Sequence, residues 1–345
     1  MTKRDNLSIS FSDNEQIEKL IFFLNEENPI SEVCKYFEIP LQDKDKWDAA
    51  LSRKNTNIEA ARKDITTVLY RPFDIRSIFY NDYFVARLNK KILRHLQNSN
   101  DAIIIGRQGQ AVGGGAWNIV YTTNRLVDQN IFYRGGGVVF PLYLYTDSGE
   151  LDSAVQRQPN LNITIVEKIA KSIGLWFTAE KQDNENTFAP IDILDYIYAV
   201  LYSNNYRTKY KEFLKIDFPR VPYPENTEQF QKLVSIGSIL RSLHLMENVS
   251  PAMDTADFLV LGTNEIETVN YKGEKVYVNK HQYFDHVPKD AWEYYIGGYQ
   301  PAKKWLKDRK VRVLSFNDIE LYQKIISVLK LTIALQVQLD ELVSI

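Results

Sequence analysis

Apolar residues recur with helical spacing at both ends of the chain. The N-terminal pattern has i, i+3, i+4, i+7 spacing and is formed by Ile17, Leu20, Ile21 and Leu24. It predicts a helix over residues 14–37, and the charged segment 44–63, which lacks Pro and Gly, predicts further helix. Over residues 317–342, two neighbouring apolar rows predict a helix whose apolar face is wider than a coiled-coil seam. This face must pack into a core or against a partner.

Between these ends, short stretches rich in β-branched and aromatic residues predict strands, since Gly, Asn or Pro bounds each of them. The stretches are 65–70, 77–80, 102–105, 117–122, 130–133 and 138–145, followed by 257–262, 267–271 and 275–279. Further helices are expected over 192–201, 206–214 and 230–245, and surface loops over 146–163 and 181–187. Two Gly-rich loops, 106–115 and 135–137, connect the first strands. The pattern predicts a mixed α+β fold.

The order of these elements divides the chain into three parts. Residues 1–64 form a helical connector, and residues 65–150 form a β-rich subdomain. Residues 151–345 form a helical support subdomain with a small sheet and the long C-terminal helix.

The composition indicates the class of protein and the cellular compartment in which it folds. Of 345 residues, 44% are hydrophobic and 25% charged, as in soluble globular proteins. Cys34 is the single cysteine, which excludes an intrachain disulfide and a Cys-rich zinc site and favours a reducing cytoplasm. No apolar run approaches the roughly 18 residues of a membrane span. The first residues contain no signal-peptide core. We therefore expect no membrane partner.

Charge is distributed unevenly along the chain. The formal net charge of −2 argues by itself against nucleic acid as a partner. Basic residues nevertheless outnumber acidic ones between Arg53 and Arg107, and the basic run 303–312 contains one acid, Asp308. Because the local field governs phosphate attraction, such segments suit a DNA-facing side. An ordinary solvated surface is the alternative.

The motifs of DNA-modifying enzymes are missing from the sequence. An amino-methyltransferase needs an Asn/Asp/Ser-Pro-Pro-aromatic turn, and the chain contains no Pro-Pro pair. No GxxxxGK[ST] loop is present for a nucleotide-driven motor. His281 and His286 lack the i, i+4 spacing that places two metal ligands on one helical face. We therefore assign no catalytic residue, metal or cofactor to this chain, although a triad assembled from distant residues stays open.

Side chains suited to reading bases gather around the Gly-rich loops. Arg pairs with guanine in a bidentate way, and Asn or Gln pairs similarly with adenine. The base-reading candidates are Arg107, Gln108, Gln110, Asn118, Arg125, Asn130 and Arg134. The phosphate-contact candidates are Arg71, Arg76, Arg87, Arg207, Lys209, Lys303, Lys304, Lys307 and Arg309. For each, an ordinary polar loop or solvated face is the alternative. Aromatic residues between Trp292 and Trp305 could stack on bases, but core packing is favoured.

Several longer motifs occur in one order. They are Tyr70–Arg76 (YRPFDIR), Phe140–Tyr145 (FPLYLY), Asp195–Leu201 (DYIYAVL), Lys211–Arg220 (KEFLKIDFPR), and Tyr295–Pro301 (YIGGYQP) leading into Lys304–Arg309 (KWLKDR). In these residues the chain resembles the C-terminal specificity region of type ISP restriction–modification enzymes. These are single polypeptides with nuclease, ATP-driven translocase, adenine methyltransferase and target-recognition parts. The resemblance covers about residues 60–343, and its first motif is also similar to type IIG enzymes. The chain departs from the usual pattern at residues 189–192 and 203–205.

The resemblance implies a bacterial, cytoplasmic domain that reads an asymmetric target on duplex DNA and presents an adenine to a methyltransferase. Residues 65–150 would then recognise the target, and residues 151–345 would clamp the DNA. The methyltransferase, translocase and nuclease would act in cis or in trans, and S-adenosylmethionine, ATP and Mg²⁺ belong to those missing parts. The positions that read bases vary within the family. The alternatives are an intact small DNA methyltransferase or endonuclease with an unrecognised site, and a protein–protein scaffold built on the last helix.

Overall fold

The structure, a computed structural model, describes residues 4–44, 47–86, 88–106, 115–146, 157–253 and 255–343. Its contacts group the chain into two compact units. The first contains Met1–Asn98 and Arg125–Ile131, and the second contains Ser99–Asn124 and Phe132–Ile345. The division of the sequence at residues 64 and 150 stays a prediction. The α+β class is confirmed.

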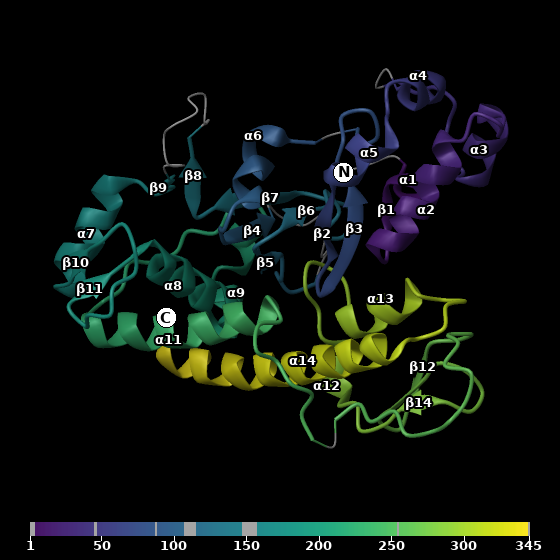
Figure 1. Ribbon diagram of the computed structural model, residues 1–345. Helices are drawn as coiled ribbons and strands as arrows, with labels where there is room; N and C mark the ends of the chain where they lie inside the picture. The colour runs from purple at the N-terminus through teal and green to yellow at the C-terminus, as the bar shows by residue number, and fades with distance from the viewer. Residues whose placement is uncertain are drawn as a thin grey trace. The chain divides into compact units, whose positions relative to one another are not determined.

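A four-stranded sheet with the order β1-β3-β2-β6 forms the centre of the first unit (Figure 1). Strands β2 (Ile65–Arg71) and β3 (Asp74–Phe79) form an antiparallel hairpin, while β1 (Ile9–Ser10) pairs with β3 and β6 (Leu126–Val127) runs parallel to β2. The strands predicted at 65–70 and 77–80 are thus confirmed. Strand β6 was not predicted, because a pair of residues carries no readable periodicity.

The helices of this unit are α1 (Asp5–Ser8), α2 (Asp13–Leu24), α3 (Ile30–Tyr36), α4 (Ala49–Lys54), α5 (Ile58–Ala61), η1 (Arg62–Asp64), α6 (Lys90–Leu93) and η2 (Arg94–Gln97). Helix α2 packs against the sheet, and α1 to α5 contribute residues to one apolar core. The single helix predicted over 14–37 is wrong, because the chain leaves helical geometry between α2 and α3. Pro29 caps the start of α3, and a proline disfavours helical geometry in the residue before it.

The second unit contains an antiparallel sheet with the order β5-β4-β7. Its strands are β4 (Ala102–Gly106), β5 (Val120–Thr123) and β7 (Gly137–Pro141). Two smaller sheets join β8 (Tyr143–Tyr145) to β9 (Arg157–Pro159), and β10 (Trp176–Phe177) to β11 (Thr187–Phe188). The strand predicted at 130–133 is wrong. These residues form turns, because the Asp128 side chain accepts a hydrogen bond from the Asn130 amide at 2.8 Å.

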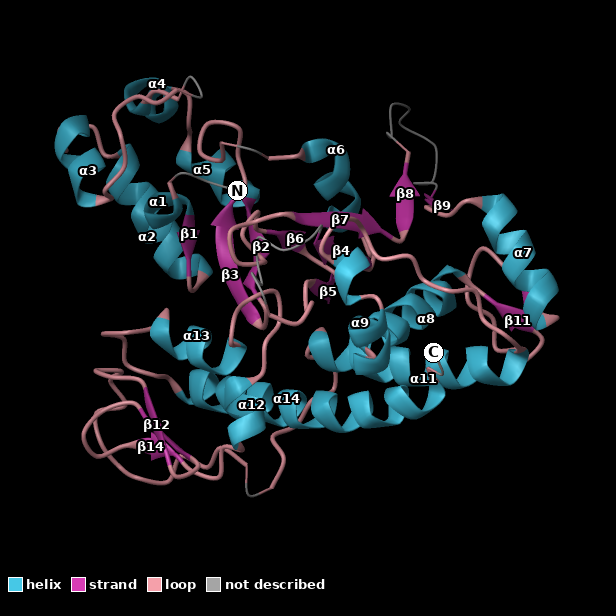
Figure 2. Ribbon diagram, turned by 180° about the vertical axis from the view of Figure 1, so that it is seen from behind, coloured by secondary structure: helices cyan, strands magenta, loops and turns pink. Residues whose placement is uncertain are grey.

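Helices support this sheet, and α11 and α14 lie side by side (Figure 2). The helices are α7 (Ile163–Ile173), α8 (Pro190–Tyr202), α9 (Asn204–Lys209), α10 (Lys211–Leu214), α11 (Thr227–His244), α12 (Lys289–Glu293), α13 (Pro301–Lys307) and α14 (Phe316–Leu342). Much of the wide apolar face of α14, including Ile325, Val328 and Leu329, is buried within this unit. Throughout the described part of the chain, no helix is both long and apolar enough to cross a membrane.

A small sheet completes the second unit. Strands β12 (Asn270–Lys272) and β13 (Lys275–Tyr277), which fall within two of the predicted strand regions or beside them, form an antiparallel hairpin, and β14 (Tyr283–Phe284) pairs with β13. The turn residues Gly273 and Glu274 both have positive φ, as tight hairpin turns require. The strand predicted over 257–262 is wrong, because only an isolated bridge at Asp257 forms there.

Backbone contact and a buried ion-pair cluster join α8, α11 and the sheet. At Gly237 of α11, an added Cβ atom would lie 2.0 Å from the Asp195 carbonyl oxygen of α8. One turn later, Arg241 donates from Nε to Asp195 Oδ1 at 2.7 Å and from Nη1 to Asp101 Oδ2 at 3.0 Å. Asp101 immediately precedes β4. This cluster therefore fixes the sheet to both helices.

His244, at the end of α11, lies in a buried hydrogen-bonded chain. Its Nδ1 lies 2.6 Å from the Tyr198 hydroxyl, and its Nε2 lies 2.9 Å from Thr332 Oγ1. The Thr332 hydroxyl donates to the Val328 carbonyl, so Nε2 must donate to Thr332 and Nδ1 must accept from Tyr198. The neutral ring with its proton on Nε2 therefore satisfies both of these hydroxyl groups. Burial lowers the pKa of His244 to about 3.

We expect His244 to reduce stability in acid. In the unfolded chain its pKa is about 6.5, so the unfolded state binds more protons between that pH and about 3. Stability is therefore lost as the pH falls from about 6.5, by up to roughly 1.4 kcal/mol per pH unit from this group. Urea unfolding of the wild type and His244→Gln across pH 5–8 measures this loss. A variant that keeps the full wild-type pH dependence would refute the prediction, and exposed His281→Gln is the control.

Candidate nucleic-acid interface

Three segments of the second unit meet at the Gly106 end of its three-stranded sheet. The Gly297 amide donates to the Asn118 carbonyl at 2.8 Å, and the Gly298 amide donates to Asn118 Oδ1 at 2.9 Å. The Gly297 carbonyl accepts from the Tyr133 amide at 2.7 Å. We call this set of hydrogen bonds the loop clasp. It joins the segment before β5, the turn before β7 and the loop before α13.

Glycine is required in the loop clasp for two reasons. Gly297 and Gly298 have φ values of 60° and 78°, which most side chains disfavour. In addition, a Cβ atom on Gly297 would lie 2.2 Å from Cδ1 of the buried Phe132 ring. The close approach of the two backbones therefore depends on the missing side chain.

The loop clasp presents aromatic and basic side chains. The Tyr133 ring is 43% exposed and meets the Tyr299 ring edge to face, with 5.7 Å between centroids. Arg134 is exposed, and its guanidinium lies 5.3 Å from the Tyr133 ring centroid. No acidic partner for Arg134 occurs among the described residues. Lys304 Nζ lies 5.8 Å from the Tyr299 centroid and pairs with Asp308. This arrangement can attract an anion and stack on a planar group.

The first Gly-rich loop begins at the same sheet end. Gly106 pairs with Gly137 of β7, and the described chain resumes at Gly115, three residues before Asn118. The candidates Arg107, Gln108 and Gln110 fall outside the described residues, as does Arg87.

Two base-reading candidates belong to the first unit. Arg125 is partly exposed and directly precedes β6. Asn130 is exposed, and its amide donates to Asp128. The structure therefore brings Asn118 and Arg134 together and places the other two in a different unit.

Two of the phosphate candidates in the first unit form internal ion pairs. Arg71 is buried and donates to Asp128 at 2.8 Å. Arg76 donates to Asp74 at 2.7 Å, and its guanidinium lies 3.9 Å from the Tyr70 ring centroid. Their contact with phosphate stays a prediction.

Among the remaining phosphate candidates, two arginines are held by internal contacts and three lysines are at least partly exposed to solvent. Arg207 donates to the Leu201 carbonyl at 2.7 Å, and Arg309 is buried against the Trp305 ring at 3.6 Å. Lys209 and Lys307 are exposed, while Lys303 is partly exposed. Within the described part of the chain these three lysines form no ion pair, so each can approach a phosphate without breaking one. Trp292 and Trp305 are buried, as the core-packing interpretation requires.

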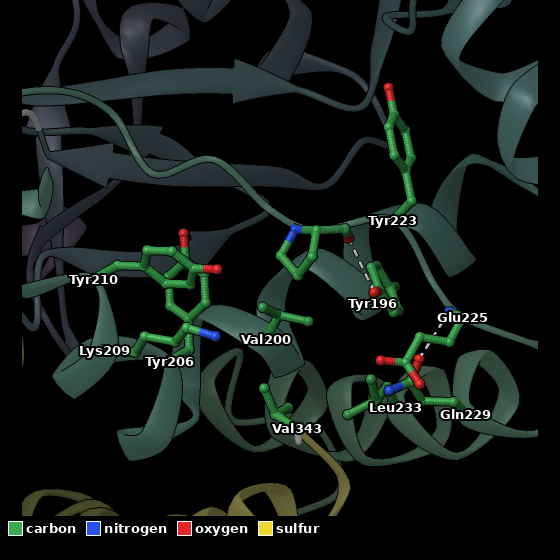
Figure 3. A pocket seen from close by; sticks show the side chains of 11 residues that line it. Tyr196, Val200, Tyr206, Lys209, Tyr210, Tyr223, Glu225, Gln229, Leu233 and Val343 are labelled. Carbon is green, nitrogen blue, oxygen red and sulfur yellow. Dashed lines mark hydrogen bonds between the residues drawn. The ribbon is translucent and has the colours of Figure 1, made fainter. Parts of the chain in front are cut away.

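The second unit contains a polar pocket and an apolar pocket. The first, of about 80 Å³, is lined by tyrosines from α8 and α9 together with Lys209, Glu225 and Gln229 (Figure 3). It has room for a few water molecules, each occupying about 30 Å³. The second, of about 300 Å³, is apolar and lies over Ile103, Phe140 and Ile193. Small-molecule sites usually have volumes of about 300 Å³ or more, and the first pocket is well below that value.

The described residues contain no group of three or more His, Cys, Asp or Glu that could hold a metal ion. Sequence reasoning missed Tyr133, which was assigned to a strand, and the pairing role of Gly297 and Gly298. The Gly-Gly pair within YIGGYQP was the available signal, because adjacent glycines mark positive φ or close backbone approach.

The chain is similar in fold to solved structures that contain DNA or a DNA substrate mimic. The DrdV–DNA complex, determined by cryoEM, matches 98% of this chain and 35% of its own, with a TM-score of 0.73 and 19% identity. The ATP-dependent Type ISP restriction–modification enzyme LlaBIII bound to DNA matches 100% and 22%, with a TM-score of 0.65 and 20% identity. A nuclease-deletion mutant of the Type ISP enzyme LlaGI, in complex with a DNA substrate mimic, matches 98% and 32%, with a TM-score of 0.63 and 18% identity.

The chain thus spans about a third or less of the length of these solved chains. No curated protein sequence matches it. The family model of the Type ISP C-terminal specificity domain matches residues 1–335, nearly the whole sequence. On this match, the chain belongs to the family of Type ISP C-terminal specificity domains.

Proposed function

We propose that this chain recognises a specific sequence on duplex DNA for a restriction–modification enzyme. The loop clasp carries the proposal, because it gathers Asn118, Tyr133, Arg134 and the ends of a Gly-rich loop at one sheet end. Membership of a specificity-domain family supports it. Similarity in fold to three solved proteins, two of them Type ISP enzymes, whose structures contain DNA or a DNA substrate mimic also supports it.

In this proposal, base reading and phosphate binding use different side chains. Arg134 has the geometry to donate two hydrogen bonds to guanine in the major groove. Lys209, Lys303 and Lys307 would neutralise phosphates, which fixes position without reading sequence. The net charge of −2 does not oppose this division, because binding depends on the local field.

We also propose that methylation, translocation and cleavage belong to other parts of a longer enzyme, in cis or in trans. S-adenosylmethionine, ATP and Mg²⁺ would bind there, since this sequence lacks a Pro-Pro turn and a GxxxxGK[ST] loop. A cytoplasmic location fits a buried, unpaired Cys34 thiol. Burial of much of the α14 face within its own unit removes the observation that favoured a scaffold.

Selection from a randomised duplex DNA pool at two salt concentrations, followed by sequencing of the bound fraction, tests the proposal. An enriched asymmetric motif of several base pairs supports it. Failure to bind duplex DNA, or binding without any motif, contradicts sequence recognition by this chain.

Arg134→Gln and Lys307→Gln should weaken binding in different ways. We expect Arg134→Gln to cost about 1–3 kcal/mol on the selected target and little on unrelated DNA. Lys307→Gln should weaken binding to all sequences alike and reduce the salt dependence by about one counterion. Binding titrations at several salt concentrations measure both. Lys168→Gln, an exposed change on α7, is the matched control. Equal effects of Arg134→Gln on target and unrelated DNA would exclude a reading role.

A further inference from the structure

The Asn118 side-chain amide has a fixed orientation. The Gly298 main chain N–H is a donor, so the Asn118 atom that faces it at 2.9 Å must be the carbonyl oxygen Oδ1. Asn118 also uses its main-chain carbonyl, which accepts from Gly297 at 2.8 Å. Rotating the amide by half a turn would place Nδ2 against the Gly298 N–H and lose the bond. The loop clasp therefore engages both carbonyl oxygens of this residue and fixes which side of the amide faces Gly298.

The amide nitrogen Nδ2 is left as a donor. It has no hydrogen-bond partner among the described residues, and the Asn118 side chain is partly exposed. Its position beside the turn of Tyr133 and Arg134 is held by hydrogen bonds rather than by a flexible loop. Fixed donors discriminate well, because little conformational entropy is lost when they bind.

We propose that Asn118 determines specificity by presenting its Nδ2 to the DNA as a donor of fixed orientation. This inference rests on the proposed function. An unrestrained asparagine reads adenine through two bonds, because it gives a donor to N7 and accepts from the N6 amino group. With Oδ1 held by the Gly298 amide, Asn118 offers its fixed Nδ2, which donates to an acceptor on the base edge: a purine N7, guanine O6 or thymine O4. The ligand class is an acceptor-bearing major-groove edge at one base pair of the target.

Replacing the side-chain nitrogen of Asn118 by an oxygen tests this inference. Asn118→Asp keeps an oxygen for the Gly298 amide and replaces the donor by an acceptor. Selection from the randomised pool should then change preference at one base pair, toward an edge that carries the cytosine N4 or adenine N6 amino group. Binding to the wild-type target should weaken by roughly tenfold to a hundredfold. Asn118→Ala, which loses the bond to Gly298, should relax preference at several positions because the loops are no longer held.

Two controls separate the outcomes. Asn317→Asp adds the same charge at an exposed residue of α14 and should leave the selected motif unchanged. Thermal unfolding of each variant shows whether it is folded. An Asn118→Asp motif identical to the wild-type motif, or identical to that of Asn118→Ala, would overturn the inference alone. A wild-type chain that selects no motif would overturn the proposed function and the inference with it.

Discussion

Replacing Arg241 with methionine should lower the free energy of unfolding by about 3–5 kcal/mol, the usual cost of removing one partner from a buried ion pair. Methionine keeps the apolar stem but leaves Asp195, with 3% of its side chain exposed, without its donor. Asp101 loses its bond to Nη1 as well. Urea unfolding at pH 7 measures the difference.

The pH dependence of this loss identifies its cause. Burial already raises the pKa of Asp195 to about 6, and removing Arg241 raises it further because Arg241 lowers it. The folded-state pKa then lies above the unfolded value of about 3.9. Above the folded-state pKa, the ionised Asp195 carboxylate lowers the free energy of unfolding by its full amount. As the pH falls through that pKa, Asp195 becomes protonated and this loss of stability disappears. Arg241→Met combined with Asp195→Asn should recover part of the stability at pH 7. A loss that is the same at pH 5 and pH 8 would contradict this explanation.

Gly237→Ala should have an effect of similar size, about 3 kcal/mol or more, at the upper end of overpacking costs. The new Cβ atom would lie 2.0 Å from the Asp195 carbonyl oxygen, and a main-chain oxygen within α8 cannot rotate away. The two helices must separate. Ser235→Ala, an exposed position in the middle of α11, provides the control and should be nearly neutral. Thermal and urea unfolding measure both variants, and a change below 1 kcal/mol at Gly237 would show that α8 and α11 can shift apart cheaply.

The two positions should not behave independently. Gly237 and Arg241 are four residues apart, on one face of α11, and both contact Asp195. Once α11 has moved away from α8, the ion pair is already weakened. We therefore expect the double variant to lose less than the sum of the single losses.

The hydrophobic pattern of the sequence predicted an element correctly where the buried face of that element follows the same pattern. The apolar rows of α14 and the strands β2 and β4 were predicted because their buried faces repeat at helical or strand spacing. Prediction failed where a single distant contact decides the structure. Residues 130–133 have strand-forming side chains, yet Tyr133 pairs with Gly297 more than a hundred residues away. No local period encodes such a partner.

The candidate site was predictable in chemistry but not in geometry. Asn118 and Arg134 were chosen for the hydrogen bonds that their side chains can form. The sequence does not predict that Gly297 connects the Asn118 and Tyr133 segments. The hydrogen bonds involved use main-chain atoms, which are the same in almost every residue type. Conversely, Arg71 and Arg309 looked equally suited to phosphate, but residue type does not reveal that each is held by internal contacts.

The atoms of the loop clasp bear on how this protein could acquire new targets. Apart from Asn118 Oδ1, its hydrogen bonds connect main-chain atoms only. Tyr133, Arg134 and Tyr299 can therefore be exchanged one at a time without removing the bonds that shape their loops. Under the proposed function, the residues that read DNA could change by point mutation while the main-chain scaffold stays the same. A library of variants that changes these three positions and keeps Gly297 would therefore preserve the hydrogen bonds that shape the loops.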